Sequence, residues 1–265
     1  SDRDQERQRE LLENVFYIRC PEGVTPAVSE EIELFGSTTG PAFHLTSNLP
    51  VSVTSMYPYG GAASYLPSAS LVLPVSAWAK EHILVNGWDG SRKPSTAQVY
   101  AAEDDTEVIV TGNVSIADGI GFRGAAAGES FTVKLQKGEL LQLAQSEEFT
   151  GSILRSNKPT ITVGGNECPF LPSPSGGACD TLAQFIPPFE QWGSEYPAVS
   201  YRPRVDGRSE EIWYRMVGAR DGTELMYDPE KPPGAPTVIN AGQLAVFRAS
   251  SDKPFVVRSR DAEHP

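Results

Sequence analysis

Apolar and polar residues alternate in short runs along the chain from Val15 onward. Runs such as VFYIRC, TEVIVTG, FTVKLQ and FVVRSR are rich in Val, Ile, Phe and Tyr, and Gly, Pro, Asn or Asp separates them. Branched and aromatic side chains in runs this short suit a pleated, half-buried surface. We therefore predict an all-β fold. Only Val75–His82 and the segment from Leu182 to Trp192 have a spacing that predicts a helical turn or two.

The first fourteen residues have a different composition. SDRDQERQRELLEN contains only Leu11 and Leu12 as apolar residues. Such a segment cannot bury enough apolar surface to offset the entropy of ordering it. We interpret residues 1–14 as a solvated lead-in, either disordered or a short frayed helix.

A proline-led strand pattern occurs three times. SNLPVSV begins at Ser47, SNKPTITV at Ser156 and SDKPFVV at Ser251. Proline suits the first residue of a strand, where the missing N–H removes no ladder hydrogen bond. The recurrence indicates internal duplication.

Three further landmarks recur in the same order. An apolar run with prolines leads to Trp78 and again to Trp192. A tight-turn signal precedes Thr106 and Thr223, and a Gly-acidic-or-amide-Leu step follows as GEL and then GQL. The equivalent tryptophans are expected in the cores of their units.

The repeated unit of about a hundred residues is the size of a jelly-roll or immunoglobulin-like sandwich. We predict two tandem β-sandwich units, residues 15–149 and residues 150–265.

Cys168 and Cys179 bracket a Gly, Pro and Ser loop, and their spacing favours a loop-closing disulfide. A disulfide would imply an oxidising compartment, whereas the alternative is two reduced thiols in a cytosolic loop. Cys20 is then unpaired, and we interpret it as a small buried hydrophobe rather than a reactive thiol.

The charge balance argues against a nucleic-acid partner. The chain has 22 Lys and Arg against 34 Asp and Glu, a net charge of -12 that repels a phosphate backbone. It has no apolar run of about 18 residues and no signal segment at Ser1. We expect a soluble, trimmed chain without membrane insertion.

Catalytic and cofactor motifs are absent from the sequence. The three histidines, His44, His82 and His264, have no zinc-ligand spacing, and no phosphate-binding glycine loop occurs. An S-x-x-K match at Ser250 lies within a proline-led strand pattern. We expect no enzyme activity, no cofactor and no metal. The acidic residues near two turns offer an alternative, calcium binding, although a solvated hairpin tip explains them too: Glu103, Asp104, Asp105, Glu107, Asp221 and Glu224.

The loop Met56–Leu66 contains three tyrosines among Gly, Ala and Ser. Tyrosine provides a large amphipathic contact area at low entropic cost. Tyr57, Tyr59 and Tyr65 are therefore candidate ligand contacts, although they would equally cover the end of a sandwich or the domain junction.

Several of these segments together resemble the N-terminal domain of the IgGFc-binding protein, a family of secreted animal and bacterial surface proteins. The resemblance spans Phe43 to about Val217. It rests on FHLTSNLPVSV, YLPSASLVLP, AAEDDTEV, KGELLQL, TGSILRSNKPTITVGGNEC and ACDTLAQFIPPFEQWGSEY. Cys168 and Cys179 match the cysteine pair of the family, and Trp192, Gly193 and Tyr196 match its W-G-x-x-Y. The resemblance implies a secreted or surface-exposed role in binding and adhesion.

We therefore expect an extracellular, non-catalytic binding or adhesion module. Its sandwich loops would contact a protein or glycan on a host or neighbouring cell surface. One alternative is a structural repeat of a fibre or matrix, with self-association. A second is a jelly-roll hydrolase acting on polysaccharide.

Overall fold

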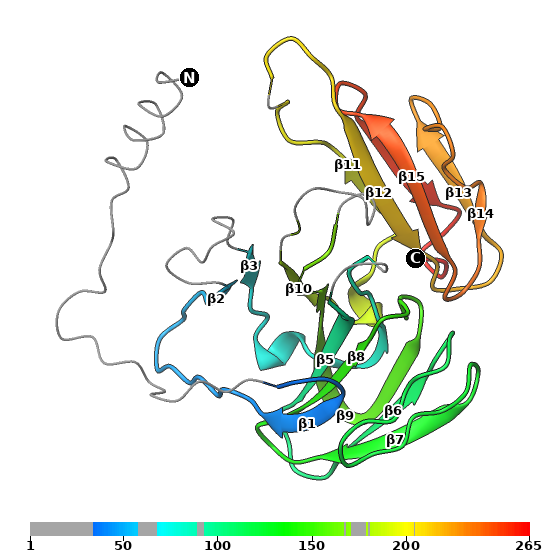
Figure 1. Ribbon diagram of the computed structural model, residues 1–265. Helices are drawn as coiled ribbons and strands as arrows, with labels where there is room; N and C mark the ends of the chain where they lie inside the picture. Colours follow the sequence, from blue (N-terminus) through cyan, green and yellow to red (C-terminus); the bar gives the residue numbers. More distant parts are fainter. Residues whose placement is uncertain are drawn as a thin grey trace, which may run out of the picture.

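The computed structural model describes residues 34–57, 68–88, 93–166, 168–170, 179, 181–203 and 205–265. The predicted lead-in, Cys20, Tyr59 and Tyr65 lie outside these residues. In the described part the chain forms sixteen strands and two single 3-10 turns, so the predicted all-β class is confirmed (Figure 1). Each segment with a helical spacing contains one of the two turns, η1 (Val75–Ala77) and η2 (Phe189–Gln191).

The strands up to the long strand β9 are β1 (Thr38–Pro41), β2 (Thr54–Tyr57), β3 (Ser68–Leu71), β4 (Ala79–Ile83), β5 (Ser95–Ala101), β6 (Thr106–Thr111), β7 (Ser130–Leu135), β8 (Glu139–Gln145) and β9 (Ile153–Asn166). The later strands are β10 (Leu182–Ile186), β11 (Glu195–Ala198), β12 (Glu211–Val217), β13 (Thr223–Asp228), β14 (Val238–Ile239), β15 (Leu244–Ser250) and β16 (Phe255–Ser259). Strands β1 and β4 to β10 form the first lobe, and strands β11 to β16 form the second lobe.

Strand β9 joins the two halves of the sheet of the first lobe. Its first part, Ile153–Ser156, pairs with β4 and β6, and its second part, from Thr160, pairs with β5 and β10. Pro159 lies between the two parts. Since proline cannot donate a ladder hydrogen bond, this is a point where a strand can exchange partners. The result is an eight-stranded sheet that curls around the core.

The core of the first lobe comes from alternate positions of its strands. Strand β5 alternates buried and half-buried residues, with Ala97 and Val99 facing inward. The inward residues pack in one cluster of fourteen buried apolar side chains, among them Leu84, Val108, Leu141, Phe149 and Leu154. This period of two is what the sequence pattern predicted for half-buried strands.

The second lobe consists of two small sheets. One has four strands in the order β11-β16-β13-β14, and the other pairs β12 with β15. Figure 1 shows the two layers in the upper body, drawn from yellow to red. The division into two tandem sandwiches with a boundary after residue 149 stays a prediction.

The strand pairings of the first lobe recur in the second. The pairs β5 with β8, β6 with β7, β4 with β9 and β6 with β9 have counterparts in β12 with β15, β13 with β14, β11 with β16 and β13 with β16. Even an exposed ion pair recurs. Arg155 contacts Glu81 at 3.1 Å, and Arg258 contacts Glu195 at 2.8 Å, in each case across the same pair of strands.

The two tryptophans occupy the same local structure. Each ends a 3-10 turn that begins after a proline, and each indole Nε1 donates to a carbonyl oxygen five residues earlier at 3.0 Å, from Trp78 to Leu73 and from Trp192 to Pro187. Both side chains are half-buried and belong to neither core. The expectation of core tryptophans is therefore wrong, because each indole caps a surface turn that satisfies its N–H.

The proline-led landmark does not hold in its third occurrence. The pairings match Arg155 and Ser156 with Arg258 and Ser259, whereas the Ser251 pattern precedes β16. The letters S-x-K-P recur there without the same strand partners. Pro254 does directly precede a strand, as expected, but Pro159 lies inside one.

His82 lies buried between β4 and β9. Its Nε2 lies 3.1 Å from the Thr160 hydroxyl and 3.3 Å from the Ala79 carbonyl oxygen, and only 1% of the residue is exposed. Burial lowers the pKa of His82 below 6.5, although the Ala79 carbonyl and the charge of Glu190 oppose the shift.

His82 should make the fold less stable in acid. Because its pKa is lower in the folded state, the unfolded chain binds the proton more readily, so the free energy of unfolding falls as pH drops through the unfolded pKa near 6.5. Urea unfolding between about pH 7.5 and about pH 5 measures this slope. The His82→Gln variant should have a shallower slope, and equal slopes would contradict the prediction.

Candidate functional site

An apolar cleft opens between the two sheets of the second lobe. Its volume is about 480 Å³, and residues from β11, β12, β13, β15 and β16 line it. The side chains that form its floor and walls are mostly aromatic or aliphatic: Tyr214, Met216, Leu225, Ile239, Phe247 and Phe255. A concave, mostly apolar surface of this size is typical of binding sites.

An aromatic cluster holds the inner wall of the cleft. The ring of Phe255 lies 5.1 Å from that of Tyr214 and 6.0 Å from that of Phe247. Tyr227 packs 6.1 Å from Phe255 and donates its hydroxyl to the Pro236 carbonyl oxygen at 2.7 Å. Burial raises the pKa of Tyr227 to about 12, so its hydroxyl stays a donor at neutral pH.

The second lobe is less completely filled than the first. Its cluster has five buried apolar residues, compared with fourteen in the first lobe, and Tyr214 and Met216 are only half-buried. The register places these two at the positions of Ala97 and Val99, which are 1% and 0% exposed. The cleft is therefore a part of the second lobe that its own side chains leave accessible.

Three exposed apolar side chains lie on β11 and on the segment that directly follows the cleft-lining residue Ala198. Tyr196 lines the cleft and is 47% exposed, and Val199 and Tyr201 are 74% and 58% exposed. Exposed apolar residues next to an apolar cleft indicate a contact surface rather than isolated surface residues. We call Tyr196, Val199 and Tyr201 the rim.

The W-G-x-x-Y motif builds one side of the mouth. Trp192, Gly193 and Tyr196 all line the cleft. The Gly193 backbone N–H donates to the Tyr196 hydroxyl at 2.7 Å, which holds the tyrosine ring against the turn. The motif therefore positions side chains at the cleft.

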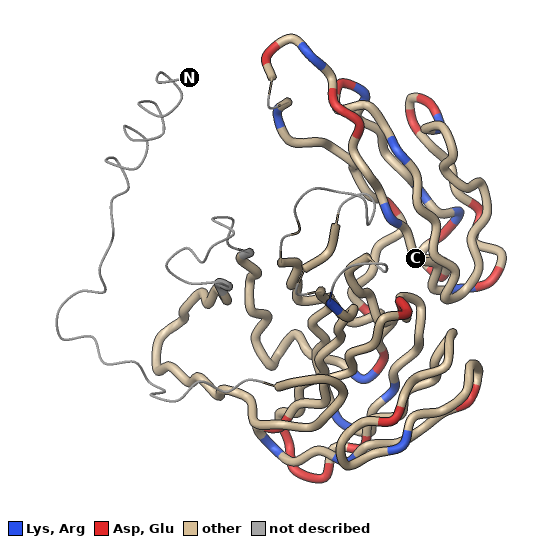
Figure 2. The backbone as a smooth tube through the Cα atoms, in the orientation of Figure 1, with Lys and Arg blue, Asp and Glu red and all other residues tan. Residues whose placement is uncertain are grey.

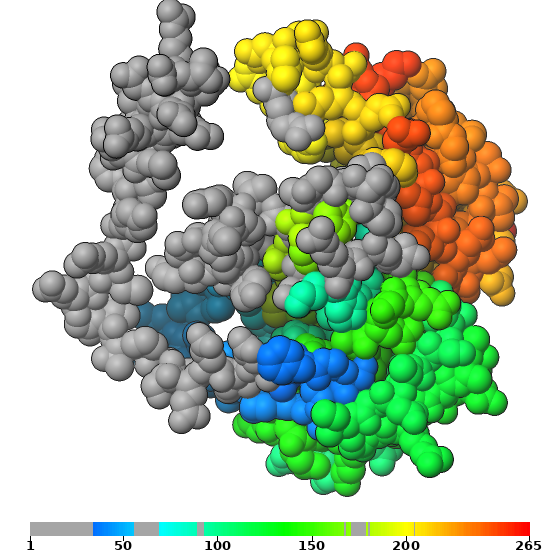
Figure 3. Space-filling model, in the orientation of Figure 1, coloured from blue at the N-terminus to red at the C-terminus, as the bar shows by residue number. Residues whose placement is uncertain are grey.

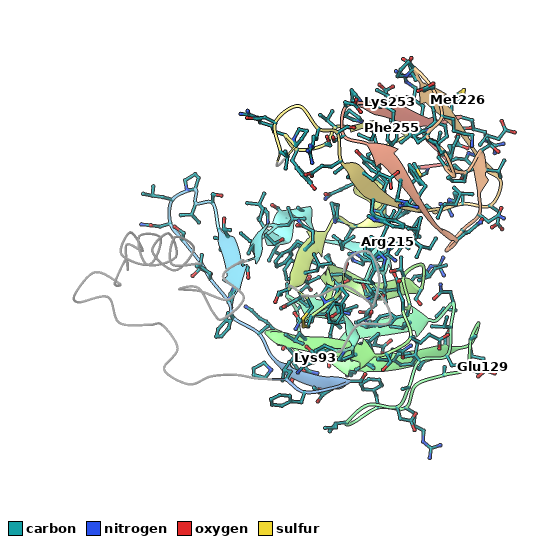
Figure 4. All side chains as sticks on the ribbon, turned by 45° about the horizontal axis from the view of Figure 1, so that its top comes forward. Lys93, Glu129, Arg215, Met226, Lys253 and Phe255 are labelled. Atoms are coloured by element: carbon teal, nitrogen blue, oxygen red, sulfur yellow. A yellow bond between two sulfur atoms is a disulfide. The ribbon has the colours of Figure 1, made fainter. Side chains whose placement is uncertain are left out.

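A buried ion pair fixes the two lobes relative to each other. Arg215 of β12 pairs with Glu148, with side chains 14% and 12% exposed, and also donates to the Asn86 carbonyl oxygen at 3.0 Å. The guanidinium lies 4.4 Å from the centre of the Trp88 ring, a cation–π contact. Figure 4 shows Arg215 at the junction and Phe255 within the upper lobe, and Figure 3 shows the lobes in direct contact.

The predicted disulfide is present. Cys168 and Cys179 are bonded, with their Cα atoms 4.9 Å apart. The residues between Phe170 and Cys179 are outside the described part of the chain. Tyr57 is the last residue of β2, and the role of Tyr57, Tyr59 and Tyr65 as ligand contacts stays a prediction.

The acidic turn residues make protein contacts. Asp105 pairs with Lys134 at 2.7 Å, and this hydrogen bond holds the Asp105 pKa below its usual range. The Asp104 carboxylate accepts from the Lys137 backbone N–H at 3.0 Å. Within the described ranges, no group of three or more His, Cys, Asp or Glu side chains is placed to hold a metal ion.

Comparison with known proteins identifies the family. The family described as IgGFc binding protein matches residues 68–265. The chain belongs to this family. The match to the IgGFc-binding family covers most of the chain and includes the whole second lobe, which the sequence resemblance followed only as far as Val217. No curated protein and no solved structure matches the chain. Within the described residues, no helix is long and apolar enough to cross a membrane.

The strands that line the cleft could be predicted from the sequence, but the cleft itself could not. The runs EIWYRMV and LAVFRA have the same short, branched and aromatic composition that predicts strands, and residues of both runs line the cleft. Large aromatic residues at inward positions of both runs were the available signal. The Glu148–Arg215 pair had no signal, because its partners are far apart in sequence.

Removing one member of the buried ion pair should destabilise the protein. The Glu148→Ala variant leaves Arg215 without its carboxylate, and we expect the free energy of unfolding to fall by about 3 kcal/mol. The Glu81→Ala variant provides the control, because its partner Arg155 is 58% exposed in the side chain and an exposed pair contributes at most about 1 kcal/mol. Denaturant unfolding measures both, and equal losses would contradict the prediction.

The disulfide should stabilise the protein by restricting the conformations of the unfolded chain. Replacing Cys168 and Cys179 by serine frees the closed loop, and the chain-entropy relation predicts a loss of about 3 kcal/mol. The measurement is denaturant unfolding of the double variant beside the oxidised protein. Reduced wild-type protein is the control and should lose as much stability as the variant. Unchanged stability in both would contradict the prediction.

Proposed function

We propose that this chain is an extracellular, non-catalytic module that binds a protein partner through the cleft and rim of its second lobe. The observation that carries the proposal is the apolar cleft, with exposed Val199 and Tyr201 on the segment that directly follows its lining residue Ala198. Membership of the IgGFc-binding family supports a protein partner. The disulfide supports an oxidising, extracellular compartment.

The lining of the cleft supports binding rather than chemistry. Arg215 is the charged residue in the lining, and it is already paired with Glu148. The other lining side chains are predominantly apolar. Such a surface stabilises a complex by burying area, at roughly 25 cal/mol per Å² before the costs of association.

We also propose that the two lobes are copies of one unit. The recurring strand pairings, the recurring tryptophan turns and the recurring Glu–Arg ion pair support this duplication. A duplicated unit also supports the alternative role of the chain as a structural repeat. Strand β9 pairs with β6 in its first part and with β10 in its second part, so one continuous strand takes part in successive pairings.

Binding should depend on the rim. The partner to test first is the Fc fragment of immunoglobulin G, the ligand in the family description. We expect saturable binding in biolayer interferometry, weakened about tenfold or more when Val199 and Tyr201 are both replaced by serine. The Met226→Ser variant is the control, because Met226 is 56% exposed and lies on β13 outside the cleft lining.

A rim variant that binds Fc as well as wild type would contradict a role for the cleft. If Fc itself does not bind, a panel of cell-surface glycoproteins and a glycan array would replace it, and saturable binding to glycans alone would contradict a protein partner. Release of sugar products from a polysaccharide panel would contradict the non-catalytic assignment.

A further inference from the structure

The buried ring of His82 has hydrogen-bond partners at one of its nitrogens. Its Nε2 lies 3.3 Å from the Ala79 carbonyl oxygen and 3.1 Å from the Thr160 hydroxyl. Because a carbonyl oxygen can only accept, the neutral ring has its proton on Nε2. Among the described residues, the buried Nδ1 has no hydrogen-bond partner. The fold therefore accommodates a neutral imidazole whose Nδ1 is an unpaired acceptor.

A second proton on this ring would have no acceptor. Protonation adds an N–H at Nδ1 and places a positive charge on a residue that is 1% exposed. A buried charge without a hydrogen-bond partner is strongly unfavourable, whereas water satisfies the same group once the site opens. The charged ring is therefore stable only where β4 separates from part of what covers it.

The groups that could balance this charge lie on the elements around β4. Charged residues occur along both lobes (Figure 2), but a buried charge is balanced only by groups close to it. Strand β4 packs against β9 and η2. The charged side chains of these three elements are Lys80, Glu81, Arg155, Lys158 and Glu190.

Most of these groups have partners on the surface. Arg155 pairs with Glu81 at 3.1 Å, and the Lys158 ammonium donates to the Asp104 carbonyl oxygen. The charge of Glu190 acts on His82 and raises its pKa, but burial of the ring lowers the pKa by more. The charge of an exposed carboxylate on η2 thus does not offset the burial of the ring.

The turn η2 is held on β4 more weakly than β9 is. Ladder hydrogen bonds join β4 to β9, whereas η2 belongs to no sheet. The Gln191 side chain donates to the Ala77 carbonyl oxygen at 2.7 Å, and the backbone N–H of Trp192 closes the turn by donating to Phe189 at 3.0 Å. A single 3-10 turn is not stable by itself, so its order depends on packing against β4. Of the two neighbours, η2 is therefore the one that separates more easily.

The same turn leads to the mouth of the cleft. Trp192 ends η2 and begins the W-G-x-x-Y motif, and Trp192, Gly193 and Tyr196 all line the cleft. Strand β11 follows from Glu195. Separation of η2 from β4 therefore moves one side of the mouth.

We propose that proton uptake by His82 releases η2 from β4, so that the buried ring acts as an acid-sensitive switch on the turn beside the mouth of the cleft. Release gives Nδ1 access to water, and the proton therefore stabilises the released state. The effect of this switch on ligand binding rests on the proposed function, whereas the release of η2 does not.

Release increases as pH falls. Burial holds the pKa of His82 below 6.5 in the closed state, and contact with water returns it toward 6.5 in the released state. The equilibrium constant for release should therefore rise by up to about tenfold for each pH unit below the pKa of the released state. The rise ends where the closed state binds the proton as well.

Amide hydrogen exchange followed by NMR between about pH 7.5 and about pH 5 tests the release. The reporters are the backbone amides of Gln191 and Trp192, and the controls are those of Glu139 and Gln243, which close turns elsewhere in each lobe. After correction for the intrinsic exchange rate, the protection factors of the reporters should fall by up to about tenfold per pH unit. Those of the controls should fall much less. Equal losses at reporters and controls would overturn the proposal, because they would indicate global unfolding.

Two variants isolate the effect of the proton. The His82→Gln side chain does not titrate in this range, so its reporters should keep the same protection factors throughout. Glu190→Gln removes a charge that favours the protonated ring in the closed state, so its reporters should lose more protection in acid than those of the wild type. Glu129→Gln is the matched control and should behave as the wild type, because Glu129 is exposed and lies away from the junction of the lobes (Figure 4).

Either of two results with these variants would overturn the proposal. One is a wild-type pH dependence in His82→Gln. The other is equal behaviour of Glu190→Gln and Glu129→Gln, a comparison that needs no change in the core.

The tautomer of His82 provides a second test. The imidazole nitrogen chemical shifts should show the Nε2–H form at about pH 7.5, and the second proton should bind as the reporters lose protection. An Nδ1–H form at neutral pH, or a charged ring beside a fully protected η2, would also overturn the proposal.

Fc binding distinguishes this inference from the proposed function. Between about pH 7.5 and about pH 5, the affinity should fall more for the wild type than for His82→Gln, because less of the wild-type chain has the closed mouth. Equal losses would overturn the link between the switch and the cleft. If Fc binds at neither pH, the proposed function fails for that ligand, and the exchange measurements still decide whether His82 releases η2.

Discussion

The pairing of β9 with four other strands is the constraint on which the architecture depends. Its first part pairs with β4 and β6, and its second part pairs with β5 and β10. A proline between the parts lets one strand exchange partners within the eight-stranded sheet. The first lobe is closed by this strand, and β10, its next partner, precedes the second lobe.

The difference between the lobes follows from this constraint. At equivalent positions Ala97 and Val99 are buried, while Tyr214 and Met216 face an accessible cleft. Among the described residues, β9 lies against the strand that carries Ala97 and Val99, whereas no strand lies on the corresponding edge of β12. The Glu148–Arg215 pair holds the incompletely covered lobe in a fixed position against the first. An accessible cleft therefore occurs in a lobe whose strand pairings match those of a closed core.

Much of the local structure followed from sequence patterns. The short alternating runs correspond to strands, the residues before Thr106 and Thr223 form turns with left-handed backbone at Asp105 and Gly222, and the two cysteines are bonded. The proline-led pattern at Ser251 repeats the residues of the Ser156 pattern without the same strand partners, so the predicted equivalence of the two was wrong. The prediction of core tryptophans was wrong as well, because a local turn that recurs in both lobes does not require a place in the core.

The amino-acid pattern alone specified the all-β class, the strand positions, the family and the disulfide, because alternation, turn residues and cysteine spacing are local properties of the chain. Tertiary structure decided which strands became neighbours. The cleft and the ion pair between Glu148 and Arg215 depend on residues far apart in sequence. Their proximity is set by strand pairing and by the packing of the two lobes, and no single run of residues encodes these contacts.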